Sequence, residues 1–111
     1  MKITVESSWI FALDEEQLPE GRITAVYPKG VALLLIKTAG EIFAIANKCA
    51  HMACSLVGGT LEGHTLQCPC HGWQFDIRTG EFVVAKEIKI PVYEWKLQDG
   101  KIFVKLEERK E

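Results

Sequence analysis

The sequence predicts an all-β protein, and two features of its pattern support that fold class. Short runs of apolar or alternating residues, rich in β-branched and aromatic side chains, are separated by Gly, Pro and Asp, which favour turns. No stretch carries the apolar periodicity of an amphipathic helix of useful length. With 111 residues, 48% of them hydrophobic and 25% charged, the chain can bury one core. We therefore expect a single domain over residues 1–111.

The expected strands follow one another along the chain, and several are joined by recognisable turns. Residues 2–6 alternate in polarity and predict a first strand. The sequence "PKG" between residues 22–27 and 31–37 predicts a hairpin, and "QDG" between residues 92–97 and 101–106 predicts another. Further strands are expected at residues 41–46, 65–68, 73–76 and 81–84, the last two joined by "IRTG".

Two segments depart from this pattern. The sequence "DEEQLPEG" favours one turn of helix, which Pro19 and Gly21 would end early. Residues 47–63 form a long connection for so compact a domain, and such connections often carry functional residues.

Composition excludes several classes of function. The formal net charge is −2 and the basic residues are scattered, so no nucleic-acid partner and no anionic membrane surface is expected. The longest apolar run, Val31 to Ile36, is far shorter than the ~20 residues that span a bilayer. Glu6 interrupts the apolar start, which argues against a signal peptide. We expect a soluble, cytoplasmic protein, in which four cysteines favour metal or redox chemistry over a disulfide framework.

The cysteines lie in two motifs, "CAHMAC" and "CPCHGWQFD". Each motif offers one thiolate and one imidazole, as Cys49-x-His51 and as Cys68-x-x-His71. A structural zinc site is chemically possible, although it normally uses paired cysteines on one knuckle. A two-iron cluster explains the mixed pairs better, because each loop would supply a cysteine to one iron and a histidine to the other.

The double motif closely resembles the Rieske [2Fe–2S] family, and "LPEG", "GEIFAIANKCAH" and "DGKIFV" extend the resemblance to Rieske ferredoxins over nearly the whole chain. It implies an antiparallel β-sandwich or barrel with a small cluster-binding subdomain at about residues 47–85. It also implies one [2Fe–2S] cluster, with Cys49 and Cys68 on the inner iron and His51 and His71 on the outer iron.

The resemblance also gives roles to residues around the ligands. Respiratory and photosynthetic relatives carry a disulfide at the positions of Cys54 and Cys70, and we expect the same pair here; two free thiols are the alternative. His64 matches no ligand position and is interpreted as an exposed bystander in the turn "EGHT". Residues expected beside the cluster or on a docking face are Met52, Leu56, Gly72, Trp73, Phe75 and Val83. Inward packing is the alternative for the docking residues, and it is the favoured one for Leu56.

These observations predict a one-electron carrier between a reductase and an acceptor such as a terminal oxygenase, not an enzyme. A terminal oxygenase would need a further mononuclear iron held by two histidines and a carboxylate, and after His51 and His71 only His64 remains. Two alternatives stay open. One is a non-catalytic electron-transfer subunit of a larger oxidoreductase, and the more remote one is a zinc-stabilised binding module.

Overall fold

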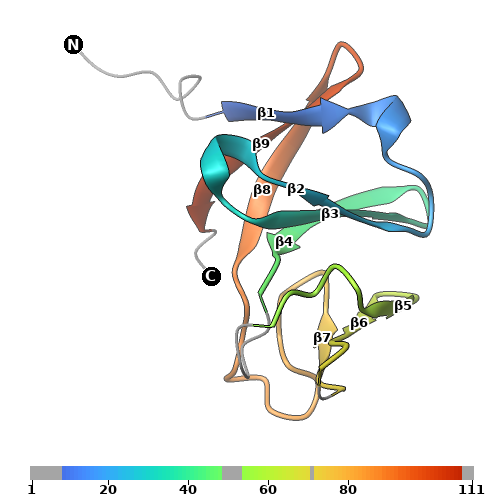
Figure 1. Cartoon of the computed structure of the whole chain (residues 1–111), viewed down its shortest axis with the longest axis vertical. Coiled ribbons are helices and arrows are strands. Elements are labelled where there is room, and N and C mark those ends of the chain that lie inside the picture. The colour runs from blue at the N-terminus through green and yellow to red at the C-terminus, as the bar shows by residue number, and fades with distance from the viewer. Residues whose placement is uncertain (1–8, 49–53, 71, 109–111) are drawn as a thin grey trace.

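The computed structural model describes residues 9–48, 54–70 and 72–108. These residues form two antiparallel sheets, one of six strands in the order β1-β9-β8-β4-β3-β2 and one of three in the order β5-β6-β7 (Figure 1). The prediction of an all-β fold is confirmed. The six strands are β1 (Trp9–Asp14), β2 (Ile23–Val26), β3 (Leu33–Thr38), β4 (Glu41–Ala46), β8 (Val92–Gln98) and β9 (Lys101–Glu108). The three are β5 (Thr60–Glu62), β6 (Thr65–Gln67) and β7 (Gln74–Asp76), and two short 3₁₀ turns are η2 (Glu15–Gln17) and η3 (Pro28–Gly30).

Strand β3 is buried on both of its faces. All four residues from Leu33 to Ile36 are 0% exposed. Leu33 and Leu35 face one core cluster, which they share with β8 and β9, whereas Leu34 and Ile36 face a second cluster, which they share with β6 and β7. Burial of each such side chain contributes about 1.5–3 kcal/mol. The apolar run from Leu33 to Ile36 therefore separates two core clusters, one on each face of β3.

The three-stranded sheet is small, and its chain is packed tightly. Each of its strands has three residues. At Gly59, just before β5, a Cβ atom would overlap the carbonyl oxygen of Gln67 on β6. This close approach of two backbones requires glycine.

Most expected strands are confirmed with small shifts at their ends. The two hairpins appear as β2–β3 and β8–β9, and residues 41–46 form β4 with the predicted bounds. The expected strand at residues 2–6 lies outside the described residues. The single helical turn expected in "DEEQLPEG" appears as η2.

Three differences from the sequence prediction concern strands. β1 and β5 were not predicted. Residues 81–84 were predicted as a strand, but only isolated bridges at Glu81 and Phe82 occur there. The segment is bent back by the Thr79–Gly80 turn and meets β7 and residues 88–89 only at single points, so no ladder forms. In the described ranges, no helix is long and apolar enough to cross a membrane.

Candidate metal centre

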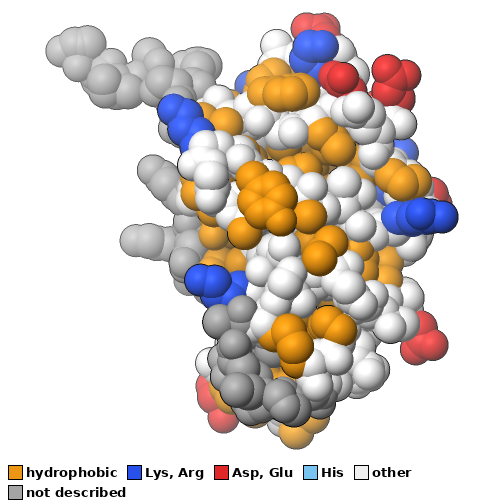
Figure 2. Space-filling view, viewed as in Figure 1, with side chains coloured by type: hydrophobic (Ala, Val, Ile, Leu, Met, Phe, Trp, Pro, Cys, Tyr) orange, Lys and Arg blue, Asp and Glu red, His pale blue; other side chains and the backbone are white. Residues whose placement is uncertain are grey.

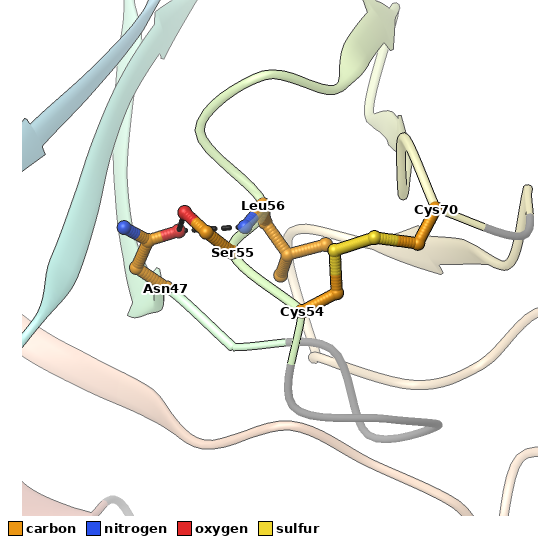
Figure 3. The surroundings of a disulfide bond; sticks show 5 residues. All are labelled: Asn47, Cys54, Ser55, Leu56 and Cys70. Atoms are coloured by element: carbon orange, nitrogen blue, oxygen red, sulfur yellow. Dashed lines mark hydrogen bonds between the residues drawn. A yellow bond between two sulfur atoms is a disulfide. The ribbon is translucent and has the colours of Figure 1, made fainter.

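The first cysteine–histidine loop leaves the six-stranded sheet at the end of β4, and a side chain joins its two ends. Asn47 follows β4 directly and is 7% exposed. Its side-chain oxygen accepts hydrogen bonds from the Leu56 N–H at 2.7 Å and from the Ser55 hydroxyl at 3.1 Å (Figure 3). The sequence analysis assigned Asn47 no role, because nothing local shows which donors it meets. Cys49, His51 and Met52 lie outside the described residues.

The second loop is closed by its own backbone. The Cys68 N–H donates to the Trp73 carbonyl at 2.7 Å, and the Gly72 N–H donates to the Cys68 carbonyl at 3.1 Å. Gly72 has a φ of 76°, in the left-handed region where a side chain is strained. Cys68 is 2% exposed at the base of this loop. His71 lies outside the described residues.

A disulfide joins the two loops. Cys54 and Cys70 are bonded, as the resemblance implied, with their Cα atoms 6.6 Å apart (Figure 3). The sulfur of Cys68 belongs to the same group, since the three sulfurs lie within 4.8 Å of one another. Cys54 and Cys70 form the disulfide, so Cys68 is the one free cysteine among the residues that the structure describes.

An aromatic stack supports the second loop from the side of β7. The rings of Trp73 and Phe82 are parallel, with centroids 4.0 Å apart. Phe75 is 0% exposed and its ring lies 5.6 Å from that of Phe82. Trp73 is half-buried. Phe75 therefore belongs to the core beneath the loop and has no surface to offer a partner.

The expected docking residues separate into buried and exposed ones. Leu56 is 0% exposed and packs inward, whereas Val83 is 42% exposed. Two exposed valines were not singled out from the sequence: Val57, at 41%, and Val84, at 81%. Their apolar side chains carry no local signal that distinguishes them from strand residues facing the core.

His64 is not the exposed bystander that the sequence suggested. Its ring meets that of Phe43 edge to face at 5.5 Å, and its Nε2 lies 3.7 Å from a carboxylate oxygen of Glu41. The Nε2 atom is buried, and the side chain as a whole is 31% exposed. Because Phe43 and Glu41 lie on β4, the imidazole packs between the two sheets. This contact is set by tertiary structure, which local sequence does not reveal.

One ionised pair ends the three-stranded sheet. The Asp76 carboxylate accepts hydrogen bonds from the Arg78 guanidinium at 2.9 and 3.0 Å and from the Arg78 backbone N–H at 2.9 Å. The hydrogen bond with the Arg78 side chain, opposed by burial, lowers the pKa of Asp76 below its ordinary value of 3.8.

The described residues fit an iron–sulfur cluster. The Cys68 thiol, buried in a loop that is closed by backbone hydrogen bonds, is of the chemical type that would supply a sulfur ligand to such a cluster. The neighbouring disulfide leaves that thiol as the only free sulfur of the three.

Comparison with known proteins identifies the family. The family described as "Rieske [2Fe-2S] domain" matches residues 8–94, and the chain belongs to it. The ferredoxin component of the naphthalene 1,2-dioxygenase/salicylate 5-hydroxylase systems of Ralstonia sp is 34% identical over 103 residues, covering 90% of this chain and 97% of that protein. The ferredoxin component of the 2,4-dinitrotoluene dioxygenase system of Burkholderia sp. (strain RASC) is 31% identical, covering 93% of this chain and 100% of that protein.

Solved structures agree with this assignment. A structure of the complex of reduced oxygenase and oxidised ferredoxin in carbazole 1,9a-dioxygenase contains a chain that matches with a TM-score of 0.82 and 26% identity, over 94% of this chain and 98% of that chain. The ferredoxin of carbazole 1,9a-dioxygenase from Nocardioides aromaticivorans IC177 matches with a TM-score of 0.83 and 23% identity, which shows the fold. The protein is thus an electron-transfer protein with one Rieske-type [2Fe–2S] cluster.

Proposed function

We propose that this protein carries single electrons from a reductase to a terminal oxygenase. The observation that supports this role best is the extent of the match. The chain covers 97% and 100% of the two ferredoxin components named above, but only 31% of the matching terminal oxygenase chain of carbazole 1,9a-dioxygenase from Nocardioides aromaticivorans IC177. The similarity therefore covers a whole carrier and only a part of an oxygenase.

We further propose that Cys49 and Cys68 bind the inner iron and that His51 and His71 bind the outer iron. A bound Rieske cluster accepts and donates one electron without making or breaking bonds. The chain's own residues hold it: Cys68 from a buried position, and the disulfide by tying the two loops together. The Trp73–Phe82 stack packs against the end of the second loop.

The apolar surface beside these loops suits a transient partner. The Val83 N–H donates to the carbonyl of Gln74, next to Trp73, so Val83 and Val84 lie beside the second loop. Figure 2 shows orange apolar side chains next to the grey residues at the lower end of the molecule, around the three-stranded sheet. Transient redox contacts are small, typically below ~1,200 Å², so a few such side chains suffice.

The docking proposal is tested with Val84→Asp, because Val84 is 81% exposed. Electron transfer to an oxygenase should slow by roughly tenfold, the effect of about 1.4 kcal/mol, with an unchanged cluster spectrum. Leu97→Asp is the matched control, since Leu97 is 44% exposed on β8 of the other sheet. Equal rates for both variants would place the docking face elsewhere.

Two other functions are separated from this one by simple measurements. A fixed subunit of a larger oxidoreductase would elute from gel filtration of native extract with its partner, whereas a carrier elutes alone. A zinc-stabilised module would be colourless and silent in EPR after reduction, and that result would overturn the proposal. We also propose a cytoplasmic location. A cluster-binding subdomain at about residues 47–85 is proposed as well, and the three-stranded sheet, at residues 60–76, lies within this range.

A further inference from the structure

The side chain of Asn47 is a polar group in an apolar setting. Among the residues that the structure describes, it is the one buried polar or charged residue, at 7% exposed. Its backbone N–H donates to the carbonyl of Ala32 at 3.1 Å, which fixes Asn47 to the chain just before β3. Burial of an amide is costly unless it is hydrogen-bonded, so the contacts of this side chain explain its presence.

Those contacts join the two ends of the first loop. The group facing Leu56 must be the oxygen of the Asn47 side chain, because a backbone N–H can only donate. Leu56 is 0% exposed and belongs to the core cluster that contains Phe75 and Cys68. The hydrogen bond at 2.7 Å therefore connects the end of β4 with the core beneath the second loop.

The disulfide alone does not provide this connection. Cys54 is tied to Cys70, and so the disulfide links one loop to the other. Asn47 links the beginning of the first loop to its own end, two residues beyond Cys54 (Figure 3). Asn47 and Cys54, which stand on either side of the proposed ligands Cys49 and His51 in the sequence, are thus both tied to the fold.

We propose that Asn47 is a positioning residue for the iron site, acting through the two ligands of the first loop. This inference rests on the proposed function. Without the acceptor, the buried N–H of Leu56 loses its partner and the loop ends separate more often. Each opening removes one of the two links that hold the described residues on either side of Cys49 and His51.

The test compares Asn47→Leu with Asn47→Asp in the iron-loaded protein. Leucine keeps the approximate volume but has no acceptor, whereas aspartate keeps the oxygen that Leu56 and Ser55 reach. Release of iron to a chelator, followed by loss of visible absorbance, should be about five- to tenfold faster in Asn47→Leu, the effect of losing one buried hydrogen bond. Its reduced EPR signal should broaden. Asn47→Asp should restore both properties to nearly those of the wild-type protein.

A control separates positioning from general stability. Ile102→Val removes one methylene from the fully buried β9 side chain, far along the sequence from the loop, and should lower the melting temperature only. If Asn47→Leu releases iron no faster than Ile102→Val, Asn47 is merely structural and the inference is overturned. If Asn47→Leu does not fold, Asn47→Ser replaces it, since serine is too short to reach both donors. Equal release from the Ser and Asp variants would then overturn the inference.

Hydrogen exchange keeps this result distinct from the proposed function. Exchange in the peptide that contains Leu56 should be faster in Asn47→Leu and normal in Asn47→Asp, whether or not iron is bound. A wild-type protein that binds no iron would overturn the proposed function, while the exchange measurement would still decide whether the loop closure exists. Unchanged exchange in Asn47→Leu would overturn the closure itself.

Discussion

Different kinds of interaction stabilise the two sheets of this protein. The six-stranded sheet has strands of four to eight residues in long antiparallel ladders, two of which contain a register shift. The three-stranded sheet has strands of three residues and depends on separate links: the disulfide, the Asn47 hydrogen bonds and the Trp73–Phe82 stack. Ladders distribute stability over many equivalent bonds, whereas each separate link can be removed alone. We therefore expect single changes to alter the iron site while the larger sheet stays folded.

The largest effect is expected from Cys68→Ser, which removes the buried thiol. The cluster should be lost completely, because a serine hydroxyl is a poor replacement for a thiolate on iron. The far-UV circular dichroism of the six-stranded sheet should remain. Visible absorbance and iron content measure the loss. The double variant Cys54→Ser/Cys70→Ser is the control and should keep its colour, while a fully coloured Cys68→Ser protein would contradict the ligand assignment.

The disulfide should matter most when iron is absent. Closing a loop with a sequence separation of 16 contributes about 3 kcal/mol on chain-entropy grounds. In the iron-loaded protein the cluster should already tie the loops together. The free energy of unfolding of the double variant Cys54→Ser/Cys70→Ser should therefore fall by much less than about 3 kcal/mol in that form. Chemical denaturation with and without iron gives the two free energies of unfolding. An equal loss in both forms would mean that the cluster does not restrain the same loops.

Phe75→Tyr tests whether a hydroxyl group in the buried core changes the reduction potential of the cluster. The resemblance to the Rieske family implies that its high-potential respiratory members have a tyrosine at this position, whose hydroxyl donates a hydrogen bond that favours the reduced state. If this hydrogen bond stabilises the reduced state by ~1 kcal/mol more than the oxidised state, the reduction potential should rise by about 40 mV, since about 59 mV corresponds to 1.4 kcal/mol for one electron. We expect the wild-type potential in the lower half of the Rieske range of roughly −150 to +300 mV. Protein-film voltammetry measures the reduction potentials of the wild-type protein and of Phe75→Tyr. A wild-type potential near the upper end of the Rieske range would contradict this expectation.

The smallest effect is expected from Arg78→Leu at the edge of the three-stranded sheet. Arg78 lowers the pKa of Asp76, so the pair stabilises the fold while Asp76 is ionised in the folded state. This stability is fully present above pH 3.8, the ordinary pKa, and is lost as the pH falls through the lowered pKa of the folded state. The difference in unfolding free energy between wild-type protein and Arg78→Leu should follow the same course in acid titration. A difference that persists below the folded-state pKa would point to packing of Arg78 instead.

The larger sheet was easier to predict than the site region. The continuous run at β3 and the "PKG" and "QDG" turns are local signals, and both hairpins were found from them. β1 was missed because its pairing with β9 joins residues as distant as Trp9 and Lys105. β5 was missed because three residues are too few to show a pattern. Residues 81–84 have strand-forming side chains but meet their neighbours only at isolated bridges.

At the site, the motif spacing was informative and the supporting contacts were not. The resemblance correctly implied the Cys54–Cys70 bond, while the assignment of Cys49, His51, Cys68 and His71 as iron ligands stays a prediction. The roles of Asn47 and His64 depend on partners that only the fold brings near them. Hydrogen-bond partners and packing of this kind are tertiary, so a single sequence does not reveal them.

The double burial of β3 has a consequence for strand register. Leu33 and Leu35 on one face differ little in size from Leu34 and Ile36 on the other, so a one-residue slide is opposed mainly at the strand ends, where it would bring Ala32 or Lys37 into a buried position. The register must therefore be set at the end of the strand. Ala39 and Gly40 make a two-residue turn with φ values of 55° and 78°, and the Glu20 carboxylate accepts a hydrogen bond from the N–H of Ala39 at 2.6 Å. A surface turn between β3 and β4 thus helps to decide which side chains of β3 pack in the core cluster that contains Cys68.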